Sequence, residues 1–458
     1  MEIPAGPRSF VPFRFLRVMQ RDPIPFLTRI AREHGDAVQF RVGPQVIVLL
    51  NHPDLVRELL VAHPRSFYKS RVIQRSKVIL GEGLLTAEGE LHRRQRRLAQ
   101  PAFHRDRIAR YAGVMVQRAA VMRGEWRDGD TVDIHHEMMR LTLSIVAKTL
   151  FDAEVEGEED DIGRALTSLI DLFPMLINPL STYIRKLPIP STLRFRKALA
   201  RLDRTIYGII EERRASGEDR GDLLSMLLLA QDEEGDGGGM SDKQVRDEAM
   251  TLFLAGHETT ANALAWTWYL LAQHPEVTAE VRRVLDEVLG DRLPTAADYP
   301  RLQYLEMVLA ESMRLYPPAW AVSRLAMEDV EIGGWHIHDG DVVVASQALI
   351  HRDPRFWPDP DRFDPTRFAP DAKLARPKFA YFPFGGGSRV CIGEGFAWME
   401  GVLILATLAQ RWEMELLTRG VEPQASITLR PRGGIRVRLS PISVPALSRS
   451  AVAPATAL

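Results

Sequence analysis

The sequence predicts one large domain that is mainly α-helical with a minor β part. Helical patterns of apolar residues dominate from Asp54 to about Leu315, and short strand-like runs precede and follow that stretch. No internal repeat and no shift in composition divides the 458 residues, of which 45% are hydrophobic and 26% are charged. We therefore expect residues 1–458 to form a single domain with a large core. Loosely ordered chain is expected over about the first 20 residues and at 440–458.

The β part begins with a predicted hairpin near the N-terminus. Residues 37–42 and 45–50 are apolar runs that flank the turn signal Gly43-Pro44. Strand-like runs return at 342–345, 414–417 and 435–439. Residues 231–239, QDEEGDGGG, are predicted to be flexible because they are polar and rich in glycine.

The longest predicted helix has clear start and stop signals. Ser241-Asp242-Lys243-Gln244 fits a capping box, and His274-Pro275 ends the helix. The segment spans roughly 32 residues, or about 48 Å of helix. Its middle reads Ala255-Gly256-His257-Glu258-Thr259-Thr260, where Gly and Thr each cost up to ~1 kcal/mol relative to Ala. Either the helix tolerates a weak spot, or it opens there for a ligand that Glu258 and Thr259 face.

Composition excludes several classes of protein. A formal net charge of −1 and a pI near 6.9 give no sign of a nucleic-acid partner. A single cysteine excludes an internal disulfide framework and any multi-cysteine zinc or iron–sulfur site, and it fits a reducing cytoplasm. The N-terminus shows no signal peptide, and no stretch of about 20 apolar residues predicts a membrane span. We expect a cytoplasmic protein.

The single cysteine lies in the stretch FPFGGGSRVCIG, residues 382–393. A lone cysteine is most often a small buried hydrophobe. Here three glycines allow a tight turn and close approach to a flat ligand, and a helical pattern begins just after Cys391. A helix N-terminus and Arg389 are expected to lower the thiol pKa, which suits a nucleophile or a metal ligand. No cysteine-protease signature surrounds Cys391, and no phosphate-loop Lys follows the glycines.

These residues resemble a known family. Phe384-x-x-Gly387-x-Arg389-x-Cys391-x-Gly393 is similar to the haem-binding loop of the cytochromes P-450, the haem–thiolate monooxygenases. Residues 255–260 resemble that family's oxygen-activation motif. The resemblance implies a cytochrome P-450 fold in which haem b lies between the long distal helix and the cysteine loop and its helix, with Cys391 ligating the iron.

Two further motifs carry the same resemblance. Glu311-Ser312-Met313-Arg314 resembles the family's Glu-x-x-Arg helix, and Pro360-Asp361-Arg362-Phe363 resembles the segment that completes it. The resemblance implies a buried pair, Glu311 and Arg314, joined by Arg362. This network is structural, and removal of one member is expected to cost on the order of 3–5 kcal/mol.

The resemblance also implies which residues contact the cofactor. The expected haem contacts are His92, Arg96, Arg324 and Arg389 for the propionates, together with Ala255, Phe384 and Gly393. Arg93, Arg94 and Arg97 are expected to form a solvated basic face that could attract an acidic electron donor. His257 is a less favoured, competing axial ligand.

The implied reaction inserts one oxygen atom from O2 into a C–H or C=C bond of a hydrophobic small molecule, a fatty acid or a terpenoid. Glu258 and Thr259 are expected to relay protons through water. Electrons are expected from NAD(P)H through a separate ferredoxin- or flavodoxin-type donor and its reductase, and the enzyme is expected to be a monomer. The alternatives are a peroxide-driven haem peroxygenase and a non-enzymatic haem sensor. The pair Glu258-Thr259 argues against both.

The substrate pocket is expected to be apolar. The residues expected to line it are 70–85, 169–180 and 320–322. Arg71, Arg75 or Lys77 could anchor a substrate carboxylate. For each of them, a solvated surface charge is the favoured interpretation.

Overall fold

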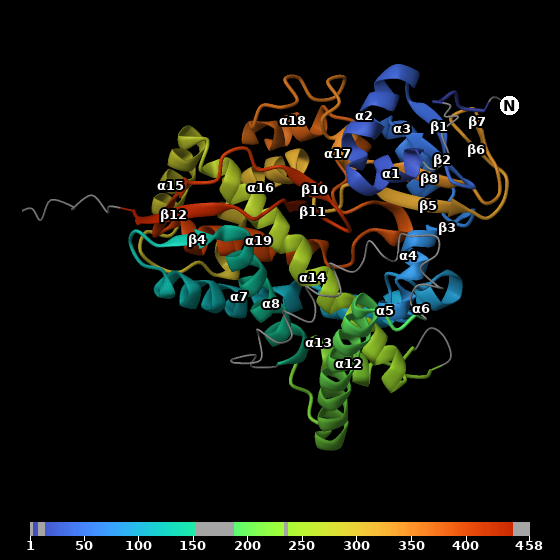
Figure 1. Cartoon of the computed structure of the whole chain (residues 1–458). Helices are drawn as coiled ribbons and strands as arrows, with labels where there is room; N and C mark the ends of the chain where they lie inside the picture. Colours follow the sequence, from blue (N-terminus) through green and yellow to red (C-terminus); the bar gives the residue numbers. More distant parts are fainter. Residues whose placement is uncertain (1–2, 8–13, 153–186, 233–236, 443–458) are drawn as a thin grey trace, which may run out of the picture.

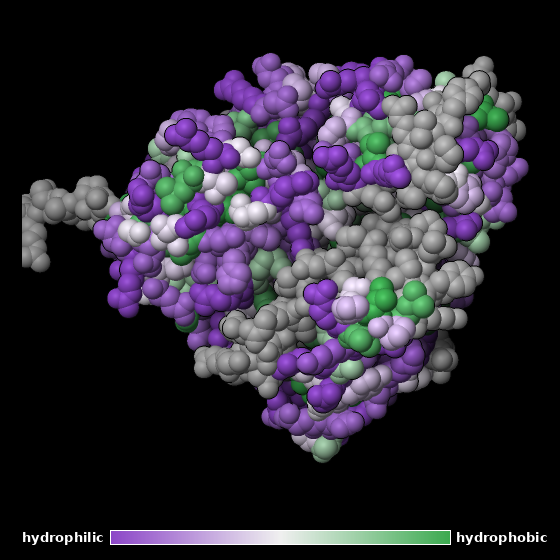
Figure 2. Space-filling view, viewed as in Figure 1, coloured by the Kyte–Doolittle hydropathy of each residue, from purple (hydrophilic) through white to green (hydrophobic). Residues whose placement is uncertain are grey.

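The computed structural model describes residues 3–7, 14–152, 187–232 and 237–442, and it shows a mainly helical protein with a smaller β-rich end (Figure 1). The β-rich end gathers strands from both halves of the chain beside the N-terminus. Hydrophilic residues predominate on the face shown in Figure 2. Among the described residues, no helix is long and apolar enough to cross a membrane.

The elements follow one another in this order. The helices are α1 (Arg14–Arg21), α2 (Pro23–His34), α3 (Pro53–Arg57), α4 (Arg71–Arg75), α5 (Lys77–Leu80), α6 (Gly89–Ala99), α7 (Arg105–Glu125), α8 (Ile134–Phe151), α12 (Pro190–Ser216), α13 (Leu223–Leu229), α14 (Asp242–Leu271), α15 (Pro275–Val288), α16 (Gln303–Leu315), α17 (Gln347–Ile350), α18 (Pro370–Leu374) and α19 (Glu394–Ala409). The strands are β1 (Ala37–Val42), β2 (Gln45–Leu50), β3 (Phe67–Lys69), β4 (Thr131–Asp133), β5 (Val322–Ala326), β6 (Val330–Ile332), β7 (Trp335–Ile337), β8 (Val342–Ala345), β9 (Trp412–Leu416), β10 (Pro423–Ala425), β11 (Leu429–Pro431) and β12 (Arg436–Pro441).

Helix α14 forms the centre of the molecule and crosses it diagonally in Figure 1. The predicted capping box is present, with Ser241 and Gln244 exchanging side-chain and backbone hydrogen bonds. The helix packs against α8, α16 and α19, so most of its side chains are buried. Trp266 is fully buried and stacks on Tyr316 with ring centroids 4.0 Å apart. A helix buried on almost every side can offer accessible surface only at an internal hollow or at its ends.

A five-stranded sheet in the order β1-β2-β8-β5-β3 builds the β-rich end. The predicted hairpin is confirmed, with Ala37 paired to Leu50 and a turn at Gly43. The predicted strand at 342–345 is β8, which pairs in parallel with β2. The register of β3 against β5 places Lys69 opposite Arg324. Residues directly opposite in an antiparallel pair share one face, so this register brings two basic side chains together.

The Glu311–Arg314 pair is buried as expected, but its third member was predicted wrongly. Both side chains are fully buried, and Arg314 donates from Nε and Nη2 to the Glu311 carboxylate at 2.7 and 2.8 Å. Arg362 is exposed and contributes only its backbone oxygen, which accepts from Arg314. The arginine near the carboxylate is Arg367, whose Nε lies 3.4 Å from Glu311 Oε1. The turn at Pro365–Phe368 directs Arg367 inward, whereas Arg362 follows Pro360-Asp361 at the surface.

The basic face predicted for α6 is exposed at Arg93 and Arg97, but Arg94 is half-buried, and both Arg94 and Arg97 are bound to other parts of the chain. Arg97 donates to both oxygens of the buried Asp232 at 3.0 Å, and Arg94 donates to the carbonyls of Gly238 and Gly239 at 2.9 and 3.1 Å. A buried carboxylate requires compensating charge, so these arginines anchor the chain before and after 233–236. Residues 233–236 of the segment predicted to be flexible, and 443–458 of the tail, lie outside the described residues.

Because Arg367 rather than Arg362 lies beside the Glu311 carboxylate, substitutions of the two arginines should change the free energy of unfolding by different amounts. Arg367→Ala removes a positive charge next to the buried Glu311 carboxylate and should lower the free energy of unfolding by about 1.5–3 kcal/mol. Arg362→Ala keeps the backbone oxygen that accepts from Arg314, so it should change the free energy of unfolding by less than about 0.5 kcal/mol. Urea denaturation of the two variants measures both values. Equal losses would contradict the assignment of Arg367.

Candidate functional site

The cysteine loop is held by its own backbone and by packing against the β-rich end. The Cys391 N–H donates to the Phe384 carbonyl at 3.0 Å, and Gly393 caps the N-terminus of α19. Gly387 has a φ of +68°, and a Cβ there would lie 1.9 Å from the Leu60 carbonyl oxygen. The glycine at this position is therefore required by the approach of the loop to another part of the chain. The sequence had suggested only close approach to a ligand.

The Cys391 thiol lies deep in the protein and yet has accessible surface. It is exposed, although burial raises its pKa to about 11. The Gly393 N–H and Arg96 lower this pKa, and Glu394 raises it. A group that is surrounded by protein and still accessible faces an internal hollow. The expectation that Arg389 lowers the thiol pKa is wrong, because Arg389 donates to the Phe67 carbonyl at 2.8 Å and to Glu88 at 2.6 Å.

We infer that the middle of α14 forms the facing wall of this hollow. Ala255 is exposed and Thr259 is half-buried, in a helix that is otherwise largely buried along this stretch. Residues four apart lie on one face of a helix. Helix α19, which begins just after Cys391, packs against α14. The hollow therefore lies between this face of α14 and the cysteine loop, which is where the sequence suggested that the helix opens.

Basic side chains converge on one edge of the site. Burial lowers the pKa of His92 to about 3, and the neighbouring Lys69, Arg389, Arg96 and Arg324 lower it further. Arg96 donates to the Val390 carbonyl at 2.7 Å, next to the cysteine. We call these five residues, His92 with its four basic neighbours, the cationic cluster. They come from β3, α6, β5 and the cysteine loop.

The described acidic residues compensate this cluster only in part. Glu88 pairs with Arg389, and no described carboxylate lies within ion-pair distance of Arg324. Burial lowers the pKa of Arg324 to about 10, and Arg389 lowers it further, while Glu88 raises it. Burial also lowers the pKa of Lys69 to about 7, against the opposing effect of Glu88. Buried positive charge of this kind is stabilised by an anion that brings its own negative charge.

Haem b fits these residues. It offers iron for a thiolate, a flat apolar ring for a hollow between a helix and a loop, and two carboxylates for the cationic cluster. Of the residues predicted from the sequence, the structure brings His92, Arg96, Arg324, Arg389 and Cys391 to one site. Lys69 was missed as a member of the cationic cluster, because only its long-range pairing with β5 places it beside Arg324, and its ammonium donates to the Leu84 and Ala87 carbonyls at 2.8 and 2.6 Å. A short run such as Phe67–Lys69 carries no local signal of this pairing.

Glu258 and Thr259 occupy different environments. The Thr259 hydroxyl donates to the Ala255 carbonyl at 2.8 Å and lies on the side of the hollow. The Glu258 carboxylate is buried and accepts from Thr428 and from Arg430 Nε, the latter at 2.7 Å. Arg430 belongs to β11, which packs against α14. The two side chains therefore reach different partners, and any proton passing between them requires a bridging group.

His257 does not face the hollow. Its ring is buried, with Nδ1 3.0 Å from the Phe253 carbonyl oxygen, and burial lowers its pKa. Thr142 of α8 donates to the His257 backbone carbonyl at 2.9 Å. This geometry disfavours His257 as a competing axial ligand.

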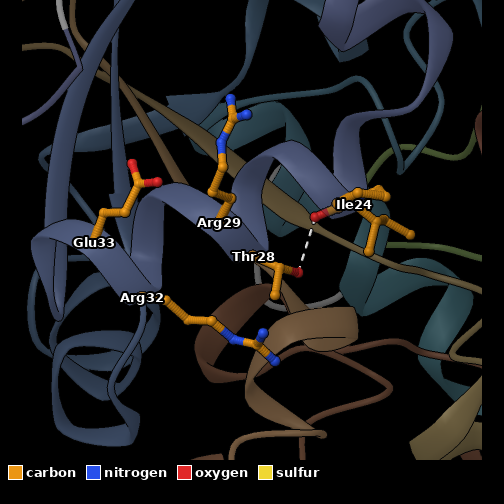
Figure 3. Close-up of a pocket in the computed structure, with 6 residues that line it drawn as sticks. Ile24, Thr28, Arg29, Arg32 and Glu33 are labelled. Carbon is orange, nitrogen blue, oxygen red and sulfur yellow. Dashed lines mark hydrogen bonds between the residues drawn. The ribbon is translucent and has the colours of Figure 1, made fainter.

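The predicted pocket-lining segments are only partly described. Residues 169–180 lie outside the described residues. Lys77 pairs with Glu82 at 2.9 Å, so it is not free to anchor a substrate carboxylate. Figure 3 shows a pocket at α2, lined by Ile24, Pro25, Thr28, Arg29, Arg32 and Glu33. None of the residues predicted to contact a cofactor or substrate lines this pocket.

One buried carboxyl group near the site was not anticipated. Glu400 of α19 is fully buried, and neither of its oxygens accepts a hydrogen bond from a described donor. Burial raises its pKa to about 8, partly offset by Thr260 of α14. The Thr260 hydroxyl donates to the Gly256 carbonyl at 3.3 Å. Burial therefore favours the neutral form of Glu400 in α19, which packs against α14.

The chain is similar to known proteins over almost its whole length. The sequence model of the family described as Cytochrome P450 matches residues 4–437. Cyclooctatin synthase from Streptomyces melanosporofaciens is 41% identical, over 93% of this chain and 91% of that protein. Cyclooctat-9-en-7-ol 5-monooxygenase from the same organism is 40% identical, over 86% and 85%. Pentalenene oxygenase from Streptomyces avermitilis is 36% identical, over 89% of each chain.

A solved structure shows the same architecture. The crystal structure of the cytochrome P450DA heme domain superimposes with a TM-score of 0.87 and 28% sequence identity. The superposition covers 96% of this chain and 98% of that one. The predicted fold, mainly α with a minor β part, is confirmed.

Glu400 predicts a pH dependence of stability. Its pKa is raised from the usual 4.5 to about 8, so the folded protein holds a proton that the unfolded chain releases between these values. Relative to Glu400→Gln, the wild type should therefore lose stability as the pH rises from about 5 to about 8, by on the order of a few kcal/mol.

Urea denaturation of the haem-loaded proteins at both pH values measures this difference. Glu415→Gln, at an exposed position on β9, is the control and should follow the wild type. A constant difference between the wild type and Glu400→Gln would show that Glu400 is ionised in the folded protein.

Proposed function

Because this chain belongs to the cytochrome P450 family, we propose that it is a monooxygenase that inserts one oxygen atom from O2 into a cyclic terpenoid, with electrons from a separate protein donor. The observation that carries the proposal is the accessible Cys391 thiol beside a buried cluster of basic side chains, together with the accessible stretch of α14. A haem sensor would need the thiol and the cluster. It would not need the hydroxyl of Thr259 on the opposite wall.

The residues divide the binding of haem between them. Cys391 would hold the iron, and Arg96, Arg324 and Arg389 would pair with the propionates. When bound, haem supplies the redox chemistry and the O2 activation that no side chain of this protein offers. The neutral His92 would donate or accept a hydrogen bond at the same edge without adding charge.

The protein's own chemistry is to supply protons and to exclude water. The Thr259 hydroxyl, which donates to the Ala255 carbonyl on the accessible stretch of α14, would supply a proton at the reacting oxygen. Glu258 is held by Arg430 and Thr428, and it can pass a proton to Thr259 only through an intervening water. The apolar surroundings keep other water out and so limit wasteful release of reduced oxygen.

A cyclic terpenoid is the proposed substrate class, on the support of apolar side chains near the site and of the named relatives. Val72, Val78, Leu254 and Ile392 are apolar, partly buried side chains in the region of α4, α5, α14 and the cysteine loop. The pairing of Lys77 with Glu82 removes one candidate anchor for a carboxylate. Two relatives are named for cyclooctat-9-en-7-ol and for pentalenene, which are cyclic terpenoids. We extend that substrate class to this chain.

The separate donor is proposed to be a ferredoxin or a flavodoxin with its reductase. Arg94 and Arg97 were expected from the sequence to belong to a basic face that attracts an acidic electron donor. Both form ion pairs with Asp232. Arg93 pairs with Glu90 on the exposed side of α6. Donor recognition is therefore expected to rely on other basic residues.

Turnover with isotopically labelled oxygen tests the proposed function. The haem-loaded protein is incubated with NADPH, a surrogate ferredoxin and its reductase, 18O2 and a set of cyclic terpenes and fatty acids. We expect a terpene product that carries one 18O atom, and no product from Cys391→Ala, which should also lose the carbon-monoxide difference band of thiolate-ligated haem. Product formation only with peroxide, or only from fatty acids, would contradict the proposal.

Thr259 predicts a loss of coupling without a loss of binding. Thr259→Ala should keep haem and substrate binding but divert about tenfold more of the consumed NADPH into hydrogen peroxide, because the proton donor of the distal wall is removed. Thr259→Ser, which retains a hydroxyl, is the matched control and should remain closer to the wild type. The ratio of product to NADPH consumed measures the effect. Full coupling in Thr259→Ala would rule out the relay.

A further inference from the structure

A small hairpin outside the proposed active site carries an unusual set of polar side chains. Strands β6 (Val330–Ile332) and β7 (Trp335–Ile337) are joined by Gly333-Gly334 and lie at the β-rich end in Figure 1. Ile332 and Ile337 are fully buried on one face of the hairpin. Directly opposite residues of an antiparallel pair share a face, and side chains alternate along each strand.

This alternation sends the intervening side chains to the other face. Glu331 is paired with His336, so both lie on the face away from the core. Asp329 and His338, one step beyond the paired region on either strand, continue the same alternation. The hairpin thus presents two carboxylates and two imidazoles on one side. The alternation therefore places Asp329 and His338, which lie at the open end of the hairpin, on the same face as His336.

Three of these side chains come within ligand distance of one another. Asp329 Oδ2 lies 3.5 Å from His336 Nε2, and Asp329 Oδ1 lies 3.9 Å from His338 Nδ1. One ligand atom from each residue lies within 4.8 Å of the other two. Bonds of about 2.0–2.2 Å in a tetrahedral zinc site place ligand atoms roughly 3.3–3.6 Å apart. Small side-chain rotations would bring all three atoms to that spacing.

The carboxylate is already oriented. The Asp339 backbone N–H donates to Asp329 Oδ1 at 2.8 Å. The imidazole rings lie 4.3 Å apart at 81° to one another. Other His–Asp contacts of the described chain, such as His104 with Asp106, bring one imidazole to one carboxylate. Only the hairpin triad lets two imidazoles share a carboxylate in a group of three possible ligands among the described residues.

We propose that Asp329, His336 and His338 bind one divalent transition-metal ion, with water in the remaining position. Two imidazole nitrogens and one carboxylate oxygen suit Zn2+, Ni2+, Co2+ or Cu2+, whereas Mg2+ and Ca2+ prefer oxygen ligands alone. The ion would close the open end of the hairpin by joining the residue before β6 to the residue after β7. Because this hairpin connects β5 to β8, the bound ion would stabilise the connection between those strands.

Zinc titration of the haem-loaded protein tests this site. Haem loading matters because it occupies the single thiol, which would otherwise compete for zinc. After treatment with a chelator, isothermal titration with ZnCl2 should show one zinc ion bound per chain and an increase in Tm, and the same titration with MgCl2 should show neither.

Four variants identify the ligands. Asp329→Asn, His336→Asn and His338→Asn should each weaken zinc binding at least about tenfold, since loss of even an outer-shell partner commonly costs that much. His104→Asn removes the histidine of a surface His–Asp pair and is the matched control, which should bind zinc like the wild type. An unchanged carbon-monoxide difference spectrum verifies that each variant is folded.

Two results would overturn the proposal. The first is a wild-type protein that binds no zinc in a one-to-one ratio. The second is zinc binding that persists in all three triad variants, or that His104→Asn weakens equally, because the ion would then lie elsewhere on the surface.

Discussion

The concentration of buried positive charge beside the single cysteine is the constraint on which the proposed site depends. Burial lowers the pKa of His92 to about 3, and the surrounding Lys69, Arg96, Arg324 and Arg389 add to this effect. Glu88 pairs directly with only one of these cations. Buried charges of one sign are unfavourable unless an anion joins them. A cofactor with two carboxylates would supply that compensation, so its binding and the folding of this region are expected to be coupled.

Several parts of the fold serve to bring this charge together. The β3–β5 register sets Lys69 against Arg324, and the cysteine loop approaches the chain at Leu60 so closely that Gly387 is required. Behind the loop, the buried Glu311–Arg314 pair binds the backbone around residue 360 through Arg314. Helix α14 supplies the opposite wall because α8, α16 and α19 support it. Long-range packing, rather than any one element, thus creates the hollow.

Local signals in the sequence predicted local structure well. The capping box at Ser241 and the hairpin about Gly43 depend on neighbouring residues, and both are present as expected. Predictions that needed tertiary knowledge were less successful. Arg362 and Arg367 both follow turns, and only the folded chain shows which one approaches Glu311. Arg94 and Arg97 suggested a solvated face because their partner, Asp232, is distant in sequence. Lys69 was missed for the same reason.

A comparison of the affinities for two forms of the cofactor tests the central claim most directly. Apoprotein is titrated with haem and, separately, with haem dimethyl ester, which keeps the iron and the ring but has no propionate charge. If the cationic cluster recognises the propionates, the ester should bind at least about a hundredfold more weakly, equivalent to about 2.7 kcal/mol. The affinities should converge when Arg96 and Arg324 are replaced by methionine. Equal affinity of the wild-type protein for both forms would contradict the account.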